Sequence, residues 1–239
     1  ALERAIQKHL TGQTTEELDV DSADTSDKPY RVGFPSDFNA QFALDTAKFW
    51  EFLQETQTKE LAKLQSRSPS DWQAKILERF DRMIKKNGLL HLLKKGLDVD
   101  EAHLTLMYPA PLASSSARVQ ENFESNIWSI TRQVCYSQAN PLQEIDMVLF
   151  LNGMPLITVE LKNAWTGQTA RFHGQKQYRE DRDATRHVHA DALVEYVTAV
   201  FDRTTFHATA HTGGTIFAPS TSASTSQSRW GRAAPFEWS

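Results

Sequence analysis

Cysteine is almost missing from this sequence, since Cys135 is the only one in 239 residues. A single cysteine excludes an internal disulfide and any zinc site built on cysteine ligands. It also fits the reducing cytoplasm, where we expect the protein to reside. Long apolar runs are missing as well, and the amphipathic residues 1–10 do not have the pattern of a signal peptide. We therefore expect no membrane partner.

An excess of positive charge is also absent. The 26 Lys and Arg residues are outnumbered by 30 Asp and Glu residues, which gives a net charge of −4. Binding to a nucleic acid would therefore need a local basic patch. Hydrophobic residues make up 40% and charged residues 23% of the chain, as in ordinary globular domains.

The first half of the chain has helical periodicity. Apolar residues recur at helical spacing over residues 1–10, 42–64, 72–87 and 89–95. Asp71 can cap the third of these segments, while Gly88 and Gly96 end the last two. Residues 11–37 are polar and predict a loop.

The second half predicts strands. Residues 103–108, 128–136, 145–151 and 156–161 are candidate strands, and Asn152-Gly153 between the last two is a strong hairpin signal. The last two are apolar on nearly both faces, as in a sheet covered on two sides. We predict an α/β fold with a central mixed sheet flanked by helices, comprising residues 1–203 with a helical insertion over about residues 40–96. Residues 204–239 predict no regular structure.

Three charged residues interrupt the apolar hairpin strands: Asp146, Glu160 and Lys162. Burying a charge is costly unless it is paired or bound to a metal ion. Glu160 and Lys162 are two residues apart and share a face. A tight turn alone would place Asp146 on the other face, whereas a three-residue loop or one bulge would pair it with Glu160. We predict the second register.

Such a cluster suits phosphodiester hydrolysis. Asp146, Glu160 and the carbonyl of Leu161 offer the oxygen ligands that Mg²⁺ prefers, and Mn²⁺ can substitute. Lys162 would orient the water and offset phosphate charge. A buried ion pair that only sets the register is the alternative interpretation.

A polar helix predicted over residues 167–183 follows directly. Arg171, Gln175, Tyr178 or Arg179, and Arg182 fall near one face of it, where they can contact DNA phosphates. A solvated surface helix is the alternative, and the pattern does not separate the two.

The run IDMVLFLNGMPLITVELKNAWTGQTA, followed by QYREDRD, resembles the PD-(D/E)xK nuclease domain of type I restriction enzyme R subunits. The segments SITRQVCYS and WEFLQETQTKELAKLQ are also similar to that family. The resemblance implies that Asp146, Glu160 and Lys162 are the catalytic triplet and that Glu3 lies near the metal ion. Tyr178 matches the Tyr of the family's Gln-x-x-x-Tyr motif, but Gly174 stands at its Gln position, so Gln175 or Gln177 would substitute. These residues, with Arg179 and Arg182, form the expected DNA-binding set.

The resemblance further implies double-stranded DNA as substrate, cut non-specifically, with methylation and specificity subunits as partners. The family continues into an ATP-driven motor, but this chain contains no Gly-x-x-x-x-Gly-Lys-Ser/Thr loop, so we expect ATP to serve only a motor beyond it. A stand-alone resolvase or repair nuclease and an inactive docking module are the alternatives.

Overall fold

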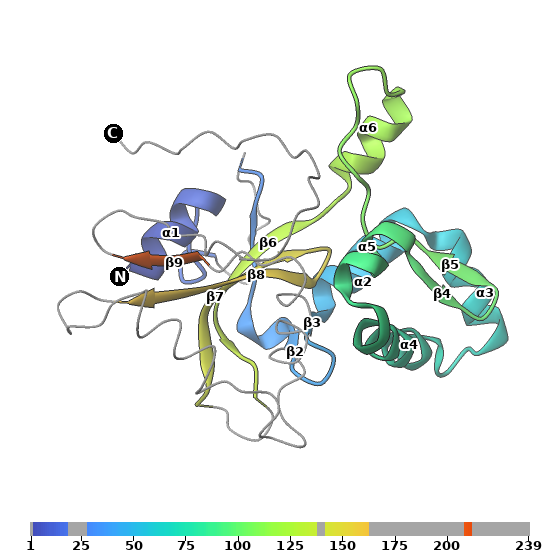
Figure 1. Ribbon diagram of the computed structural model, residues 1–239, viewed down its shortest axis with the longest axis horizontal. Helices are drawn as coiled ribbons and strands as arrows, with labels where there is room; N and C mark the ends of the chain where they lie inside the picture. Colours follow the sequence, from blue (N-terminus) through green and yellow to red (C-terminus); the bar gives the residue numbers. More distant parts are fainter. Residues whose placement is uncertain (1, 19–27, 138–141, 163–207, 212–239) are drawn as a thin grey trace, which may run out of the picture.

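The centre of the protein is a five-stranded mixed sheet in the order β1-β6-β7-β8-β9. The computed structural model describes residues 2–18, 28–137, 142–162 and 208–211 (Figure 1). The strands are β1 (Arg31–Val32), β6 (Trp128–Cys135), β7 (Glu144–Leu151), β8 (Met154–Lys162) and β9 (Ala208–His211). The two outer pairs, β1 with β6 and β8 with β9, are parallel, whereas the inner pairs are antiparallel. The predicted α/β class with a mixed sheet is confirmed.

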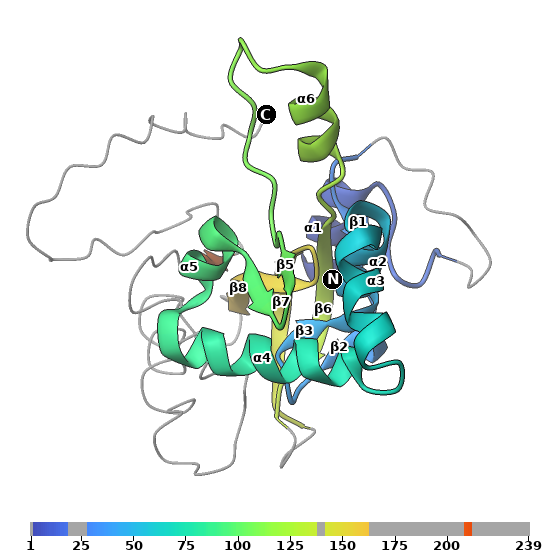
Figure 2. The same ribbon diagram turned by 90° about the vertical axis from the view of Figure 1, so that its right-hand side faces the viewer.

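Helices lie on two sides of this sheet. They are α1 (Leu2–Thr11), α2 (Thr46–Thr56), α3 (Thr58–Arg67), α4 (Trp72–Asn87), α5 (Leu89–Lys95), α6 (Ala117–Glu124) and the short 3₁₀ helix η1 (Pro35–Asp37). Figure 1 shows α2 to α5 gathered on one side and α1 on the other, and both Figures 1 and 2 show α6 projecting from the body. In the part of the chain that the structure describes, no helix has the length and apolar character needed to cross a membrane.

One hydrophobic core joins the helices to the sheet. Phe49 and Phe52 of α2 and Phe80 of α4 are fully buried, and they belong to the same cluster as Val148 and Phe150 of β7. The buried residues of α4 recur every four positions, which is the spacing that keeps one helix face against a core. The helical insertion is therefore packed onto the end of the sheet that carries the β7–β8 turn.

The helix predicted over residues 42–64 is divided in two at Gln57. This residue leaves the helical region, with φ −137° and ψ 38°, and ends α2. Its buried side chain bonds both backbone groups of Thr105: Nε2 donates to the carbonyl at 2.7 Å, and Oε1 accepts from the N–H at 2.6 Å. The Gln57 carboxamide thus satisfies the N–H and the C=O of Thr105, which have no neighbouring strand to pair with among the described residues.

Several short elements differ from the predictions. The candidate strand over residues 103–108 is confined to β5 (Ala102–Leu104), which forms a hairpin with β4 (Leu97–Val99). A second small hairpin, β2 (Phe38–Asn39) with β3 (Leu44–Asp45), precedes α2. Strand β1 lies within the predicted loop, β9 within the segment with no predicted structure, and α6 was not predicted. The Asp71 side chain does not cap α4.

The predicted hairpin turn at Asn152-Gly153 connects the sheet to the insertion. Both residues have positive φ, 51° and 79°, as a two-residue hairpin turn requires. The buried Asn152 side chain accepts from Ile127 N–H at 2.7 Å and donates to the Leu106 carbonyl at 2.9 Å. A Cβ on Gly153 would lie 2.3 Å from the carbonyl oxygen of Asp45, so only glycine fits beside the start of α2.

Replacing Asn152 by Ala should therefore destabilise the whole fold. The variant loses the bonds to Ile127 and Leu106 and forces alanine into the left-handed region, so we expect the free energy of unfolding to fall by about 3 kcal/mol. Urea unfolding followed by circular dichroism measures it. The Asn122→Ala variant in α6 is the control, and a loss below about 1 kcal/mol for Asn152→Ala would contradict the proposed role of the turn.

Asp45, at the N-terminus of α2, is a buried carboxyl group. Its Oδ1 accepts from Lys48 N–H at 3.0 Å, whereas the buried Oδ2 has no hydrogen-bond partner in the described part of the chain. Burial raises the pKa of Asp45 from 3.8 to about 6, because the helix cap and the nearby Lys48 charge offset only part of the desolvation cost.

This raised pKa predicts a pH-dependent stability. Because the folded state holds the proton more tightly, stability from this group is greatest below pH ~4 and declines as pH rises through ~6, by about 3 kcal/mol in all. Asp45→Asn cannot ionise and can still accept from Lys48 N–H, so it should gain stability over the wild type by that amount between pH ~4 and ~7. Urea unfolding across this range tests it. Asp71→Asn, at the exposed start of α4, should show no such gain.

Candidate active site

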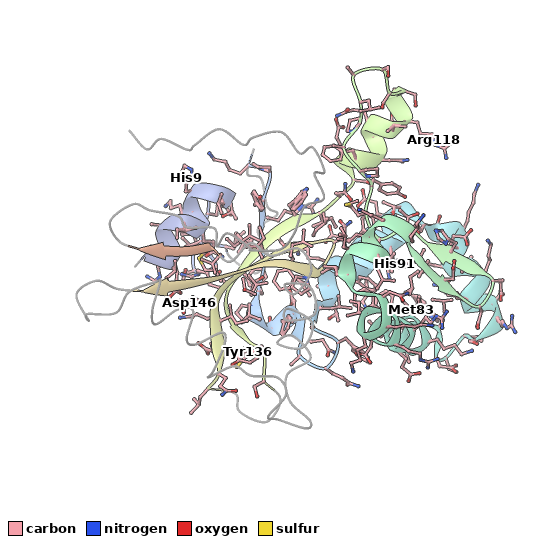
Figure 3. The ribbon with its side chains drawn as sticks, in the orientation of Figure 1. His9, Met83, His91, Arg118, Tyr136 and Asp146 are labelled. Atoms are coloured by element: carbon pink, nitrogen blue, oxygen red, sulfur yellow. The ribbon has the colours of Figure 1, made fainter. Side chains whose placement is uncertain are left out.

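Asp146 lies where strands β7 and β8 separate. The pairing between the two strands runs from Leu151–Met154 to Met147–Val159 and stops there. Beyond it, the Asp146 carboxylate accepts a hydrogen bond from the backbone N–H of Leu161, at 2.5 Å. Figure 1 shows β8 continuing towards β9 while β6 and β7 turn away, and Figure 3 labels Asp146 near this fork. At this fork Asp146 is partly exposed.

The register has the form that we predicted. The tight turn pairs Leu151 with Met154, and the register then shifts by one residue between Leu149 and Phe150. Phe150 pairs with Pro155 and Leu149 with Ile157, so one residue of β8 is left unpaired as a bulge. The observed pairs end at Met147–Val159, and the shifted register, extended by one position, would align Asp146 with Glu160 and not with Val159.

Glu160 and Lys162 occupy the last part of β8, which also pairs with β9. In this parallel ladder Glu160 stands beside Thr209 and Lys162 beside His211. The side chains of Glu160 and Lys162 lie outside the described residues. Their shared face therefore follows from the backbone, because residues two apart in a strand lie on the same side of the sheet.

Helix α1 brings Glu3 close to Asp146. Glu3 is partly buried, and its pKa is raised, first by desolvation and next by the negative charge of Asp146. The positive charge of Arg132 opposes this rise. Glu3 is therefore within electrostatic range of Asp146, whereas its role at a metal ion, which the resemblance implies, stays a prediction.

Arg132 and Glu16 are charged residues near the site that the sequence analysis did not identify. Arg132 is only 8% exposed on β6, and its guanidinium binds Glu16 at 2.5 Å, which lowers the pKa of Glu16 to about 2. The Arg132 Nε is buried and has no hydrogen-bond partner within the described residues. An arginine within the buried strand run SITRQVC was the available signal.

The oxygen atoms at the fork suit a hard divalent cation. Glu3 and Asp146 are two carboxylates whose mutual repulsion a cation would relieve, and the peptide that follows Glu160 lies against Asp146. Among the described side chains, which do not include that of Glu160, no group of three or more Asp, Glu, His or Cys residues could hold a metal ion. A complete ligand set would need at least one group beyond the described side chains, and Glu160 is the predicted one.

The expected DNA-binding residues lie outside the described part of the chain. They are Gln175, Gln177, Tyr178, Arg179 and Arg182, together with Arg171 of the same predicted helix. Their role stays a prediction.

Metal binding offers a direct test of the fork. Asp146→Asn keeps an oxygen that can accept from Leu161 N–H but removes the charge, so we expect the chain to stay folded and its Mg²⁺ affinity to fall at least about tenfold. Titration calorimetry with Mg²⁺ and Mn²⁺ measures the affinity. Glu101→Gln, which removes an exposed carboxylate paired with Arg67, serves as the control. Equal affinities for wild type and Asp146→Asn would exclude this carboxylate as a ligand.

Comparison of the sequence with known proteins identifies a family. The model of the family described as type I restriction enzyme R protein N terminus matches residues 11–219. Neither the curated proteins nor the solved structures include a match to this chain. The family match spans the sheet, the helical insertion and all three residues of the predicted triplet. The chain therefore belongs to the family of type I restriction enzyme R protein N-terminal domains.

Proposed function

We propose that this chain is the metal-dependent endonuclease domain of a type I restriction enzyme R subunit. It would hydrolyse phosphodiester bonds of double-stranded DNA non-specifically, after ATP-driven translocation by a motor that lies outside this chain. The observation that carries the proposal is the β7–β8 fork. There Asp146 stands next to Leu161 and within electrostatic reach of Glu3, in a register that sets it opposite Glu160.

Each residue of the predicted site would have its own role in the hydrolysis. Asp146 and Glu160, with the Leu161 carbonyl and Glu3, would hold Mg²⁺ or Mn²⁺. When bound, the metal ion would polarise the scissile phosphate and lower the pKa of a water molecule. Lys162 would orient the attacking water and stabilise the negative charge that develops on the phosphate oxygens. The water oxygen bonds to phosphorus as the bond from phosphorus to the leaving sugar oxygen breaks, and that oxygen takes up a proton.

The segment after β8 would hold the DNA. Gln175 or Gln177, with Tyr178, Arg179 and Arg182, would contact phosphates and position the strand without reading its sequence. Recognition would then come from the specificity subunit, with the methylation subunit in the same cytoplasmic complex. A local basic patch of this kind would allow DNA binding although the net charge of −4 does not favour it.

Loss of the Glu160 or Lys162 side chain should slow DNA cleavage but leave ATP hydrolysis by the motor unchanged. In the assembled complex, we expect Glu160→Ala and Lys162→Ala to lower the rate of plasmid cleavage at least about 100-fold, because each removes a group that acts on the reacting phosphate. ATP hydrolysis by the same complex should be unchanged.

Two surface variants control for nonspecific effects. Glu121→Ala in α6 and Lys86→Ala in α4 make the same chemical changes at exposed positions and should cut at the wild-type rate. Cleavage by both triplet variants at the wild-type rate would overturn the proposal in favour of a docking module. Loss of ATP hydrolysis as well would point to an assembly defect, which thermal unfolding of the variants would reveal.

A further inference from the structure

Gln133 has a backbone conformation that is rare inside a strand. Its φ is 52°, in the left-handed region that costs a residue with a Cβ about 1 kcal/mol or more. Among the described residues, the other non-glycine positions with positive φ are Ala43, Asp100 and Asn152, and each lies in a turn. Gln133 instead lies within β6, so this strain has no turn to explain it.

The strained residue stands opposite Asp146. The β6–β7 ladder pairs Arg132 with Met147 and Val134 with Ile145, and between these pairs it is interrupted at Gln133. One residue on each strand lies in the gap, so the gap is no bulge, and its other member is Asp146. The ladders on both sides of Asp146 are thus interrupted, because the pairing of β7 with β8 also ends at Met147, the residue next to Asp146.

The side chain of Gln133 is free to bind a ligand. Its strand neighbours Arg132 and Val134 are buried, whereas Gln133 is exposed. Its carboxamide has no hydrogen-bond partner among the residues that the structure describes. Strained backbone for which the described residues offer no compensating interaction is characteristic of positions that act on a ligand.

The surroundings select the kind of ligand. Glu3, Glu144 and Asp146 place negative charge in this region, and the nearby Arg132 is already bound to Glu16. A phosphate there needs a donor, and the carboxamide NH₂ supplies one without adding a positive charge that would compete with a metal ion.

We propose that Gln133 is a further DNA-contacting residue of the cleavage site, whose side-chain NH₂ donates to a phosphate oxygen of the strand held at Asp146. This inference rests on the proposed nuclease function and assigns the contact to β6, a strand outside the predicted DNA-binding set.

A glycine substitution at position 133 tests the side-chain contact without adding backbone strain. Gln133→Gly adopts positive φ without strain, so the R subunit should be as stable as the wild type or more so. In the assembled complex, plasmid cleavage should nevertheless slow at least about tenfold, since a bond to a charged group is lost. The Mg²⁺ affinity and the rate of ATP hydrolysis should not change. Asp100→Gly, which relieves the same strain at the exposed β4–β5 turn, is the matched control and should cut normally.

Gln133→Glu tests the donor itself. It has nearly the same shape, but it replaces the NH₂ by a negatively charged oxygen, so it should cut at least as slowly as the glycine variant. If both variants cut at the wild-type rate while Asp146→Asn is inactive, this inference is overturned and the proposed function stands. A fall in Mg²⁺ affinity for Gln133→Gly would also overturn it, because the residue would then act through the metal ion. If Asp146→Asn itself cuts normally, the proposed function fails, and the inference with it.

Discussion

The buried carboxamide of Asn152 is the interaction on which the rest of the structure depends. Together with Gly153 it forms the turn that starts the β7–β8 hairpin, and it also bonds the segments that enter β6 and leave β5. The turn backbone also binds the N-cap residue of α2, because Asp45 N–H donates to the Gly153 carbonyl at 2.9 Å. A single buried turn therefore fixes the place of the sheet, the helical insertion and the small hairpin relative to one another.

From this turn the position of the candidate site follows along the hairpin. A two-residue turn by itself would have set Asp146 against Val159, on the wrong face for Glu160. The bulge between Pro155 and Ile157 corrects the alignment by one residue and keeps the apolar pairs of the core in place. Proline at the bulge costs little, because the N–H that it lacks is less needed where a ladder is irregular. The site thus depends on an irregularity in a strand whose apolar character is otherwise uniform.

The sequence predicted those parts of the fold that depend on local periodicity. The helices α1, α4 and α5, the long strands and the hairpin turn all have repeating apolar residues or a specific turn pair. What it did not predict depends on distant partners. Gln57 breaks a helix because Thr105, 48 residues away, needs its carboxamide. The strands β1 and β9 are too short to show a period and form only beside β6 and β8. Likewise, the triplet was predicted from charges within apolar strands. Arg132 gave the same kind of signal, but its partner Glu16 lies 116 residues away, and the φ of Gln133 leaves no mark in a single sequence.

The parallel pairing of β9 with β8 has a consequence for the integrity of the sheet. β9 lies 46 residues beyond the end of β8, yet it covers the edge of the strand that carries Glu160 and Lys162. A chain cut before residue 208 would leave that edge as a row of unpaired N–H and C=O groups. Such an edge recruits strands from other molecules, so self-association would compete with folding in a shortened form of the protein.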